Sequence, residues 1–299
     1  MATEPVPDYS DVVSATGFLR PRASRSMATF HEHLLTSTRI LALLGAGLSA
    51  SSGIPTYRGA GGLWRTHDAT QLSTPAAFAA DPALVWEFHL ERLKEIQKAN
   101  PNAAHHALAE FAKKNVHSLA LTMNVDNLSE RAGHPEEALW HLHGLLGNLK
   151  CSSCDLLLSP ADSAATLEPL LQRDSANSLT LDDVPRCRRE ECKDGLLRPA
   201  VVWFTESLPQ PLLASIATWI GDVNDTSKNI DAMLVIGTSA LVYPATAYIE
   251  AARRKGARVA VVDIEKEDPS LLGLAEQDWY LQGDAAVLVP EMLKPIIGS

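Results

Sequence analysis

The chain has 299 residues, of which 46% are hydrophobic, and a formal net charge of −10 at pH 7. This length suffices for one large domain or two smaller ones with buried cores. The negative charge disfavours direct binding of nucleic acid. No apolar run reaches the ~20 residues of a membrane-spanning helix, so we expect neither a nucleic acid nor a membrane as a partner.

The N-terminal stretch carries Glu4, Asp8 and Asp11 ahead of its first arginine, Arg20. Mitochondrial import sequences are usually poor in acidic residues. We therefore predict that residues 1–30 form a flexible leader, with mitochondrial import as the lesser alternative.

Short apolar runs recur along the chain, at residues 40–44, 119–123, 200–204, 233–236 and 259–262. They lack polar alternation, which indicates strands buried on both faces, as in a parallel sheet covered by helices. Helical patterns at residues 103–113 and 245–255 lie between some of these runs, and Gly256 provides a stop signal for the second helix. The alternation predicts an α/β fold with a doubly wound, Rossmann-type parallel sheet.

Two segments, residues 64–100 and 145–198, interrupt this alternation. We predict that they form a smaller inserted module, with one helix near residues 164–172. The doubly wound part then consists of residues 31–63, 101–144 and 199–299.

The first predicted strand is followed by Gly45, Gly47 and Ala50, which match the pattern G-x-G-x-x-G/A. Such a loop lets a diphosphate approach the backbone at a helix N-terminus, although a tight turn without a ligand has the same pattern. Gly53 and Pro55 break the following helix almost at once. This break excludes an ordinary dehydrogenase, in which the helix would continue to a second strand.

Other candidate ligands of a nucleotide also follow predicted strands. Ser49 and the turn Gly237-Thr238-Ser239 offer small hydroxyls and amides that suit phosphate, or they simply cap helices. Asp263 and Glu265 follow the last predicted strand, where a carboxylate can take ribose hydroxyls. The alternative for Asp263 is a plain turn residue.

All four cysteines fall within 42 residues, as Cys151-x2-Cys154 and Cys187-x4-Cys192. Two such pairs are the pattern of a closed tetrahedral Zn²⁺ site, which leaves no position for water and is therefore structural. Four free buried thiols are the alternative. A secreted disulfide scaffold would spread more cysteines over a shorter chain, so we expect an intracellular protein, cytoplasmic or nuclear.

Six ordered motifs together resemble the sirtuin signature. They are GAGLSASSGIPTYRG at 45–59, NVD at 124–126, LHG at 142–144, the two cysteine pairs, VVWFTE at 201–206 and GTS at 237–239. The pattern RGAGGLWR at 58–65, with VWEF at 85–88 and Tyr243-Pro244, is most similar to class III sirtuins, which remove acidic acyl groups from lysine. The resemblance runs from about residue 30 to 290.

This resemblance implies an NAD-dependent protein-lysine deacylase that acts on acyl-lysine proteins or peptides. The acyl carbonyl oxygen attacks C1′ of the nicotinamide ribose and expels nicotinamide. His143 then acts as general base on a ribose hydroxyl, and the products are free lysine and O-acyl-ADP-ribose. His141 would share the face of His143 in an extended segment, so position alone does not separate the two histidines.

The resemblance also assigns binding residues, and it implies that Asn124 and Asp126 serve catalysis by lining the nicotinamide pocket. Residues 54–65 would form a loop over the nicotinamide ribose, and the segment at 201–206 would pair with the substrate peptide. The implied NAD-binding residues are Gly45, Ala46, Gly47, Ser49, Ala50, Pro55, Tyr57, Arg58, Met123, Asn124, Asp126, Gly237, Thr238, Ser239, Asp263, Glu265, Gly283, Asp284 and Ala285. The implied substrate-binding residues are His89, Arg92, Val202, Phe204 and Glu206.

Three positions depart from the family pattern. Met123 replaces a Gln whose amide can hydrogen-bond the ribose, and Thr205 replaces a Gly where the peptide backbone approaches. His89-x-x-Arg92 stands where class III members have Tyr and Arg. We hypothesise that Arg92 still holds a distal carboxylate, so that succinyl- or glutaryl-lysine is a substrate, and that His89 makes this preference pH-dependent. A solvated surface pair is the alternative.

Met123 and Thr205 keep a second enzyme class open, namely NAD glycohydrolysis or ADP-ribosyl transfer through the same ribose carbon. A weakly active NAD-binding scaffold is disfavoured, because His143, Asn124 and Asp126 are all present.

Overall fold

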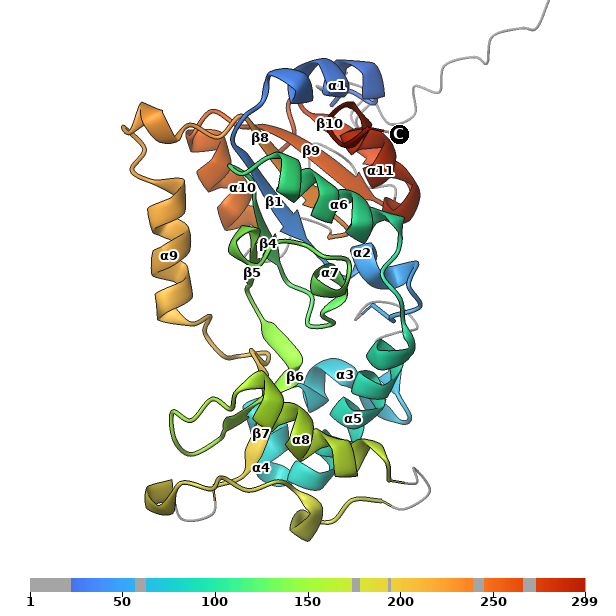
Figure 1. Cartoon of the computed structure of the whole chain (residues 1–299), viewed down its shortest axis with the longest axis vertical. Helices are drawn as coiled ribbons and strands as arrows, with labels where there is room; N and C mark the ends of the chain where they lie inside the picture. Colours follow the sequence, from blue (N-terminus) through green and yellow to red (C-terminus); the bar gives the residue numbers. More distant parts are fainter. Residues whose placement is uncertain are drawn as a thin grey trace, which may run out of the picture.

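The computed structural model describes residues 23–56, 63–173, 178–192, 195–238, 245–265 and 273–298. Figure 1 shows two parts along the long axis, a larger part built on a sheet and a small module below it. Within the described residues, the larger part has a six-stranded sheet of order β10-β9-β8-β1-β4-β5, in which every pair is parallel. Its strands are β1 (Ile40–Leu44), β4 (Leu119–Thr122), β5 (Leu139–His141), β8 (Ala232–Ile236), β9 (Arg258–Asp263) and β10 (Trp279–Gln282).

The apolar side chains on both faces of this sheet are buried, because helices cover each face (Figure 1). Ala42 and Leu44 of β1 pack in the core on the side of α1, α6 and α11, whereas Leu41 and Leu43 pack in the core against α9 and α10. The covering helices are α1 (Met27–Thr36), α6 (Ala103–Lys114), α9 (Gln210–Ile220), α10 (Ala245–Arg254) and α11 (Ala285–Ile297). The predicted doubly wound α/β fold is therefore confirmed.

In the described residues, the small module contains two two-stranded antiparallel sheets and four helices, and its main core includes Trp86 and Trp203. Its elements are β2 (Leu63–Trp64), β3 (His67–Asp68), α3 (Ala69–Leu72), α4 (Pro75–Ala80), α5 (Pro82–Lys98), β6 (Gly144–Cys151), α8 (Pro160–Leu171) and β7 (Leu197–Val201). The indole N–H of Trp86 donates to the carbonyl of Leu197 at 3.0 Å, which ties α5 to β7.

The remaining helices are short. They are α2 (Gly47–Ala50), α7 (Leu128–Arg131) and the 3₁₀ turns Glu136–Ala138, Leu181–Asp183, Glu190–Cys192 and Thr226–Lys228. Helix α2 ends after one turn and Gly53 follows with φ +86°, as the sequence predicted. Gly256 follows α10 with φ +92°, which confirms its predicted role as a stop.

One predicted strand belongs to a different sheet from the one expected. The run at 200–204 was expected in the parallel sheet, but its first residues belong to β7, which pairs antiparallel with β6 in the small module. The run does not continue as a strand, because Glu206 accepts a hydrogen bond from the backbone of Trp203 and Thr205 turns the chain with φ +73°. The small module therefore extends past the predicted boundary at residue 199.

The folded part also begins earlier than residue 31. Ser24 forms a parallel bridge with Trp279, and Phe30 of α1 is fully buried. Residues 23–30 thus pack on the sheet, while the rest of the predicted leader lies outside the described residues. No helix in the described ranges has the length and hydropathy needed to cross a membrane.

Leu234→Ala tests the importance of the central sheet, since Leu234 of β8 is 1% exposed. We expect the free energy of unfolding to fall by about 2–5 kcal/mol, because the cavity between β8 and the covering helices cannot collapse fully. Urea denaturation measures it, with the exposed Val223→Ala as control, for which we expect a change within about 0.5 kcal/mol. Equal effects of the two substitutions would contradict this assignment of the core.

Candidate functional site

The loops that follow β1 and β8 touch each other at the carboxyl ends of the two strands. Gly45 donates its backbone N–H to the carbonyl of Ile236 at 2.9 Å, and Gly47 donates to that of Gly237 at 2.8 Å. A Cβ atom on Gly45 would lie 2.6 Å from the Gly237 oxygen, and one on Gly47 would lie 2.7 Å from the Gly237 Cα. Gly237 itself has φ +65°. Glycine is required at all three positions, and the result is a backbone-lined cradle where open parallel sheets bind ligands.

A buried polar cluster lies beside this cradle and joins residues that are far apart in the sequence. Ser49 donates its hydroxyl to Asp126 Oδ2 at 2.6 Å, and Asn124 Nδ2 lies 3.3 Å from the same hydroxyl. Asp126 Oδ1 also accepts from the backbone of Leu128 at 3.0 Å. Burial raises the pKa of Asp126, and these hydrogen bonds oppose that shift. Three of the predicted site residues are thus held in one network.

His105 belongs to the same cluster, although the sequence analysis did not select it. Its Nε2 lies 3.4 Å from the Ser49 hydroxyl, and burial lowers the pKa of His105 to about 4. The signal available in the sequence was a helix cap, because Asn102 caps α6 and His105 completes a capping box. That pattern does not indicate a site residue.

His143 follows β5 and is oriented by the backbone of the neighbouring strand. Its Nδ1 lies 2.9 Å from the carbonyl oxygen of Met123, which can only accept a hydrogen bond. The ring proton is therefore on Nδ1, and Nε2 keeps its lone pair. Burial lowers the pKa of His143, although the bond to Met123 opposes the shift. His143 is accordingly a neutral imidazole at pH 7, as a general base requires.

His141 differs clearly from His143 in its surroundings. His141 Nε2 lies 2.7 Å from Glu130 Oε1, so this ring joins β5 to α7. The geometry thus separates two histidines that the sequence alone did not.

Met123 directly follows β4, and its backbone N–H donates to the carbonyl of Leu44 at 2.8 Å. Its side chain is partly buried against the core on the α9 and α10 side. The departure from Gln therefore places an apolar side chain next to the Asn124–Asp126 segment.

The predicted ribose ligands have roles within the chain. Asp263 Oδ1 accepts from the backbone of Glu265 at 3.1 Å, which is the turn role considered as its alternative. Asp284 caps α11 through Ala286 at 2.8 Å and accepts from the Ser51 hydroxyl at 2.8 Å and 2.6 Å. The contact between Ser51 and Asp284 joins the start of α11 to the loop after α2.

The other predicted NAD-binding residues follow from their places in the chain. Ala46 is the N-cap of α2, Ala50 is its last residue and Pro55 follows it, while Thr238 follows Gly237, and Gly283 and Ala285 flank Asp284. Tyr57, Arg58 and Ser239 lie outside the described residues.

His89 and Arg92 lie on α5, with His89 in the core of the small module rather than on its surface. His89 is 3% exposed, and Trp203 donates its indole N–H to His89 Nε2 at 3.1 Å. Burial lowers the pKa of His89 to about 3, and the charges of Arg198 and Arg92 contribute. His89 therefore stays neutral at physiological pH, which contradicts both the expected pH dependence through His89 and the surface-pair alternative. Arg92 pairs with Glu95 at 3.1 Å.

The segment at 202–206 is held by internal bonds. Val202 donates its backbone N–H to the carbonyl of His143, and Phe204 donates to that of Ser73, both at 2.9 Å. Glu206 accepts from Arg198 at 2.8 Å and 2.7 Å. These two backbone donors are therefore already used and do not contribute to the expected pairing with a peptide.

Thr205 in this segment has φ +73°, an unfavourable conformation for a β-branched residue. Such backbone strain costs about 1–3 kcal/mol and persists only where the surroundings enforce it. The bonds of Glu206 to Arg198 and to the backbone of Trp203 supply that enforcement.

The four cysteines converge as the sequence predicted. Their Sγ atoms all lie within 4.8 Å of one another. A Cβ atom on Gly195 would lie 2.7 Å from the sulfur of Cys192 and 2.9 Å from that of Cys151, so glycine is required there. Four convergent thiolates fit a tetrahedral Zn²⁺ and leave no open position for a catalytic water.

Comparison with known proteins shows which family the chain is similar to. The model of the Sir2 family matches residues 45–244. An NAD-dependent protein deacylase of Candida albicans is 37% identical over 92% of this chain and 99% of its own length, and one of Pyrococcus furiosus is 40% identical over 88% and 95%. The mitochondrial NAD-dependent protein deacylase sirtuin-5 of Danio rerio is 35% identical over 82% and 80%.

Solved structures agree with these relatives. A Sir2 homologue in complex with NAD has a TM-score of 0.73 and 30% identity, covering 95% of this chain and 98% of its own. A complex of Sir2 with a p53 peptide and NAD+ has a TM-score of 0.70 and 26% identity, covering 90% and 98%.

Stability should fall in acid because of His89. In the unfolded chain the pKa of His89 is 6.5, whereas burial in the folded chain lowers the pKa of His89 to about 3. Protonation of His89 therefore favours the unfolded chain as the pH falls below 6.5. This residue lowers the free energy of unfolding by about 1.4 kcal/mol per pH unit. Urea denaturation between pH 7 and 5 should show a smaller pH slope in His89→Gln than in wild type. Equal slopes would show that folded His89 is not held neutral.

Proposed function

The chain belongs to the Sir2 family, and we infer from this premise that it is an NAD-dependent protein-lysine deacylase. It transfers the acyl group of an acyl-lysine protein or peptide to ADP-ribose and releases nicotinamide. The observation that carries this function is His143, a neutral imidazole whose Nε2 keeps its lone pair beside the Asn124–Asp126 segment.

NAD, when bound, supplies an electrophilic ribose carbon with nicotinamide as its leaving group. We propose that the cradle formed by Gly45, Gly47 and Gly237 takes the diphosphate, because these three residues carry no side chain and lie at the carboxyl ends of β1 and β8. Asn124 and Asp126 would lie against the nicotinamide, held in place by their contacts with Ser49.

We assign His143 as the general base that removes a proton from a ribose hydroxyl through Nε2. The carbonyl of Met123 supports this role, because it accepts a hydrogen bond from Nδ1–H and stabilises the imidazolium that forms when Nε2 takes up a proton. The pKa of His143 lies below its ordinary value, so the base remains available at pH 7. We expect activity to decline only as the pH falls toward the lowered pKa of His143.

Zn²⁺ is the second group that this chain holds, through Cys151, Cys154, Cys187 and Cys192. Because all four positions are thiolates, the ion stabilises the small module and takes no part in the reaction. We propose a division in which the sheet-bearing part binds NAD, whereas the small module holds zinc and forms an acyl-lysine wall from the predicted substrate-binding residues. These residues are His89, Arg92, Val202, Phe204 and Glu206.

We also propose that acidic acyl groups remain substrates. Arg92 provides a fixed charge for a distal carboxylate. The bond from Trp203 places the proton of neutral His89 on Nδ1, so the ring has one N–H to donate. Any pH dependence of acyl preference must then come from groups other than His89, since its pKa is about 3.

An intracellular location is part of this proposal, because four clustered thiols suit a reducing compartment. The mitochondrial name of the Danio rerio relative supports the mitochondrion as one candidate, beside the cytoplasm and the nucleus. NAD glycohydrolysis stays the alternative function, since Met123 offers no amide to the ribose.

His143→Asn should lower deacylation by at least about 100-fold, because it removes the general base. Mass spectrometry of acyl peptides incubated with NAD follows O-acyl-ADP-ribose. His141→Gln is the matched control and should lose far less activity, since His141 contacts Glu130 instead. Formation of ADP-ribose without peptide consumption in the wild type would favour glycohydrolysis over deacylation.

Arg92→Ala should lower kcat/KM for succinyl-lysine peptide by roughly 10–100-fold, the range of a lost charge-assisted hydrogen bond, and should spare acetyl-lysine peptide. Lys98→Ala, at the exposed end of the same helix, should change neither substrate. Parallel loss on both peptides would reject the carboxylate-binding role of Arg92.

A further inference from the structure

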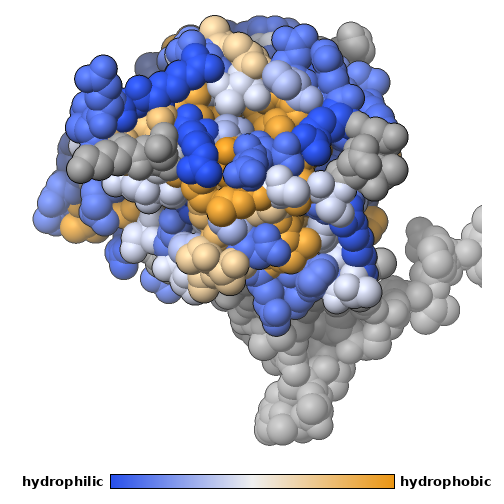
Figure 2. Space-filling view, turned by 90° about the horizontal axis from the view of Figure 1, so that it is seen from below, coloured by the Kyte–Doolittle hydropathy of each residue, from blue (hydrophilic) through white to orange (hydrophobic). Residues whose placement is uncertain are grey.

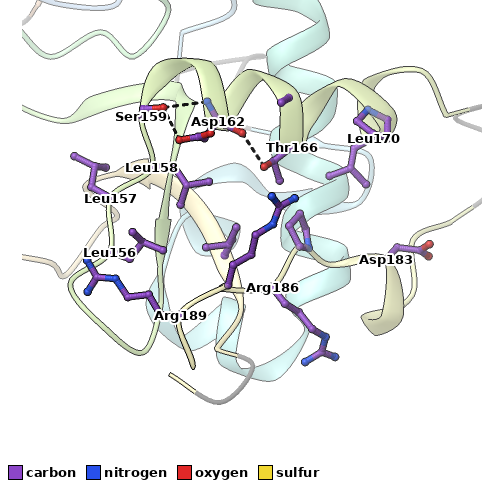
Figure 3. A pocket seen from close by; sticks show the side chains of 15 residues that line it. Leu156, Leu157, Leu158, Ser159, Asp162, Thr166, Leu170, Asp183, Arg186 and Arg189 are labelled. Carbon is purple, nitrogen blue, oxygen red and sulfur yellow. Dashed lines mark hydrogen bonds between the residues drawn. The ribbon is translucent and has the colours of Figure 1, made fainter. Parts of the chain in front are cut away.

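Polar groups at the surface of the small module bind one another. Figure 2 shows this end of the molecule, where hydrophilic side chains lie around and across the hydrophobic ones. In the groove of about 710 Å³ beside α8, Asp162 accepts from the Ser159 hydroxyl at 2.6 Å, and its carbonyl accepts from Thr166 at 2.8 Å (Figure 3). Arg189, which also lines the groove, pairs with Asp155. These bonds begin and end within the small module.

His105 of α6 differs from these groups, because its bonds lead to the proposed NAD site. It is 1% exposed, and burial lowers the pKa of His105 to about 4, so the ring is neutral at pH 7. Nδ1 accepts from the backbone N–H of Asn102 at 3.3 Å, and Nε2 lies 3.4 Å from the hydroxyl oxygen of Ser49. A neutral imidazole has one proton and Nδ1 is an acceptor here, so the proton lies on Nε2 and is donated to Ser49.

The hydrogen bond from His105 leaves the Ser49 hydroxyl one direction for its own proton. The Ser49 oxygen also lies 3.3 Å from Nδ2 of Asn124, an amide nitrogen that can only donate. The two lone pairs of this oxygen are therefore used by His105 and Asn124. The O–H donates to Asp126 Oδ2 at 2.6 Å. The orientation of Ser49 is thus fixed by the chain itself.

This orientation selects the atom that Asn124 offers to a ligand. Nδ2 of Asn124 donates to Ser49 and to the carbonyl of Gly45 at 3.0 Å, so both of its protons are used. Within the described part of the chain no group donates to Oδ1 of Asn124. Oδ1 is therefore the acceptor that this side chain offers to a donor group of the cofactor.

Removal of the His105 donor would leave one lone pair of the Ser49 oxygen without a partner. Ser49 is 1% exposed, and an unsatisfied polar atom in such a place is unfavourable. Another rotation of the hydroxyl then competes with the observed one. The bonds of Ser49 to Asn124 and Asp126 would weaken together.

We propose that His105 is a positioning residue of the NAD site, which acts through the Ser49 hydroxyl to hold Asn124 and Asp126 in place for the cofactor. This rests on the proposed deacylase function and deepens it, because it gives a role to a buried group outside the residues that were predicted to bind NAD. The same imidazole caps α6, so one side chain joins the packing of that helix to the geometry of the site.

Two substitutions separate positioning from capping, since capping needs only the acceptor at Nδ1 and positioning needs the donor at Nε2. His105→Asn keeps an acceptor for the backbone of Asn102 but is too short to reach Ser49. His105→Gln can accept from Asn102 through its carbonyl, as in other capping boxes, and donate to Ser49 through its amide. His106→Asn makes the same change at the exposed neighbouring position and is the matched control.

Isothermal titration of the zinc-loaded full chain with NAD measures the effect directly. We expect His105→Asn to raise the Kd for NAD about five- to tenfold, the loss typical of one hydrogen bond, and His105→Gln and His106→Asn to stay within about twofold of the wild type. In steady-state assays the KM for NAD should rise by the same factor, while the KM for the acyl-lysine peptide should not change. A partly unfolded variant would instead lower kcat and leave both KM values as they were.

A double-mutant cycle with Ser49→Ala tests whether His105 acts through Ser49. Ser49→Ala itself should weaken NAD binding, because it removes the bonds to Asn124 and Asp126. In the Ser49→Ala background, His105→Asn should change the Kd for NAD by less than about twofold. An equal loss with and without the Ser49 hydroxyl would overturn the proposal.

The wild-type protein supplies a test that does not depend on the folding of His105→Asn. In long-range ¹H–¹⁵N spectra of protein labelled with ¹⁵N-histidine, the signals that are absent from His105→Gln belong to His105. They should show a proton on Nε2 and none on Nδ1 at pH 7. A proton on Nδ1 would contradict the proposal, whatever the behaviour of the variants.

The outcomes distinguish the role of His105 from the deacylase function. NAD binding without turnover of the acyl-lysine peptide would reject the deacylase function, whereas the titrations still report on His105. Equal Kd values for His105→Asn and His105→Gln would overturn the role of Nε2, and so would a loss of similar size in His106→Asn. Absence of NAD binding in the wild type would overturn both proposals.

Discussion

The contact between the β1 and β8 loops is the constraint on which the site depends. Gly45 and Gly47 approach Gly237 so closely that a single added Cβ on any of them would collide with backbone. This approach sets the spacing between the ends of two central strands and leaves a surface made of backbone. The same contact fixes the position of α2, from which the Ser49 hydroxyl donates a hydrogen bond to Asp126. The proposed nucleotide site and the central sheet are therefore parts of one packing arrangement.

A second close approach lies where the chain passes from the sheet to the small module. Gly144 has φ +73°, and a Cβ there would lie 2.1 Å from the carbonyl oxygen of Ala200. His143 directly precedes Gly144 and contacts the residues that follow two strands. Its ring contacts Met123 after β4, and its backbone carbonyl accepts a hydrogen bond from Val202 after β7. The proposed base thus lies at the junction of the sheet-bearing part and the small module, with its ring held by Met123 and its backbone by Val202.

The proposed acyl-lysine wall is built from charged and aromatic groups that stabilise one another. The guanidinium of Arg198 lies 3.7 Å from the ring centre of Trp203 and also binds Glu206, while Trp203 donates to His89. Each polar atom that is buried here gains a partner, which offsets the cost of removing it from water. The same network enforces the positive φ of Thr205 and keeps His89 neutral.

The sequence by itself determined the sheet-and-helix alternation, the cysteine pairs and the early end of α2, because each depends on local residue types and spacing. Tertiary structure decided the rest. Whether the run after residue 199 joins the parallel sheet, whether His89 is buried, and which histidine faces Met123 all depend on partners distant in the chain. His105 shows the same limit, since its cap is local but its contact with Ser49 is not. Burial and pairing are properties of the packed chain, so a side chain's chemistry was settled only where the fold brought its neighbours to it.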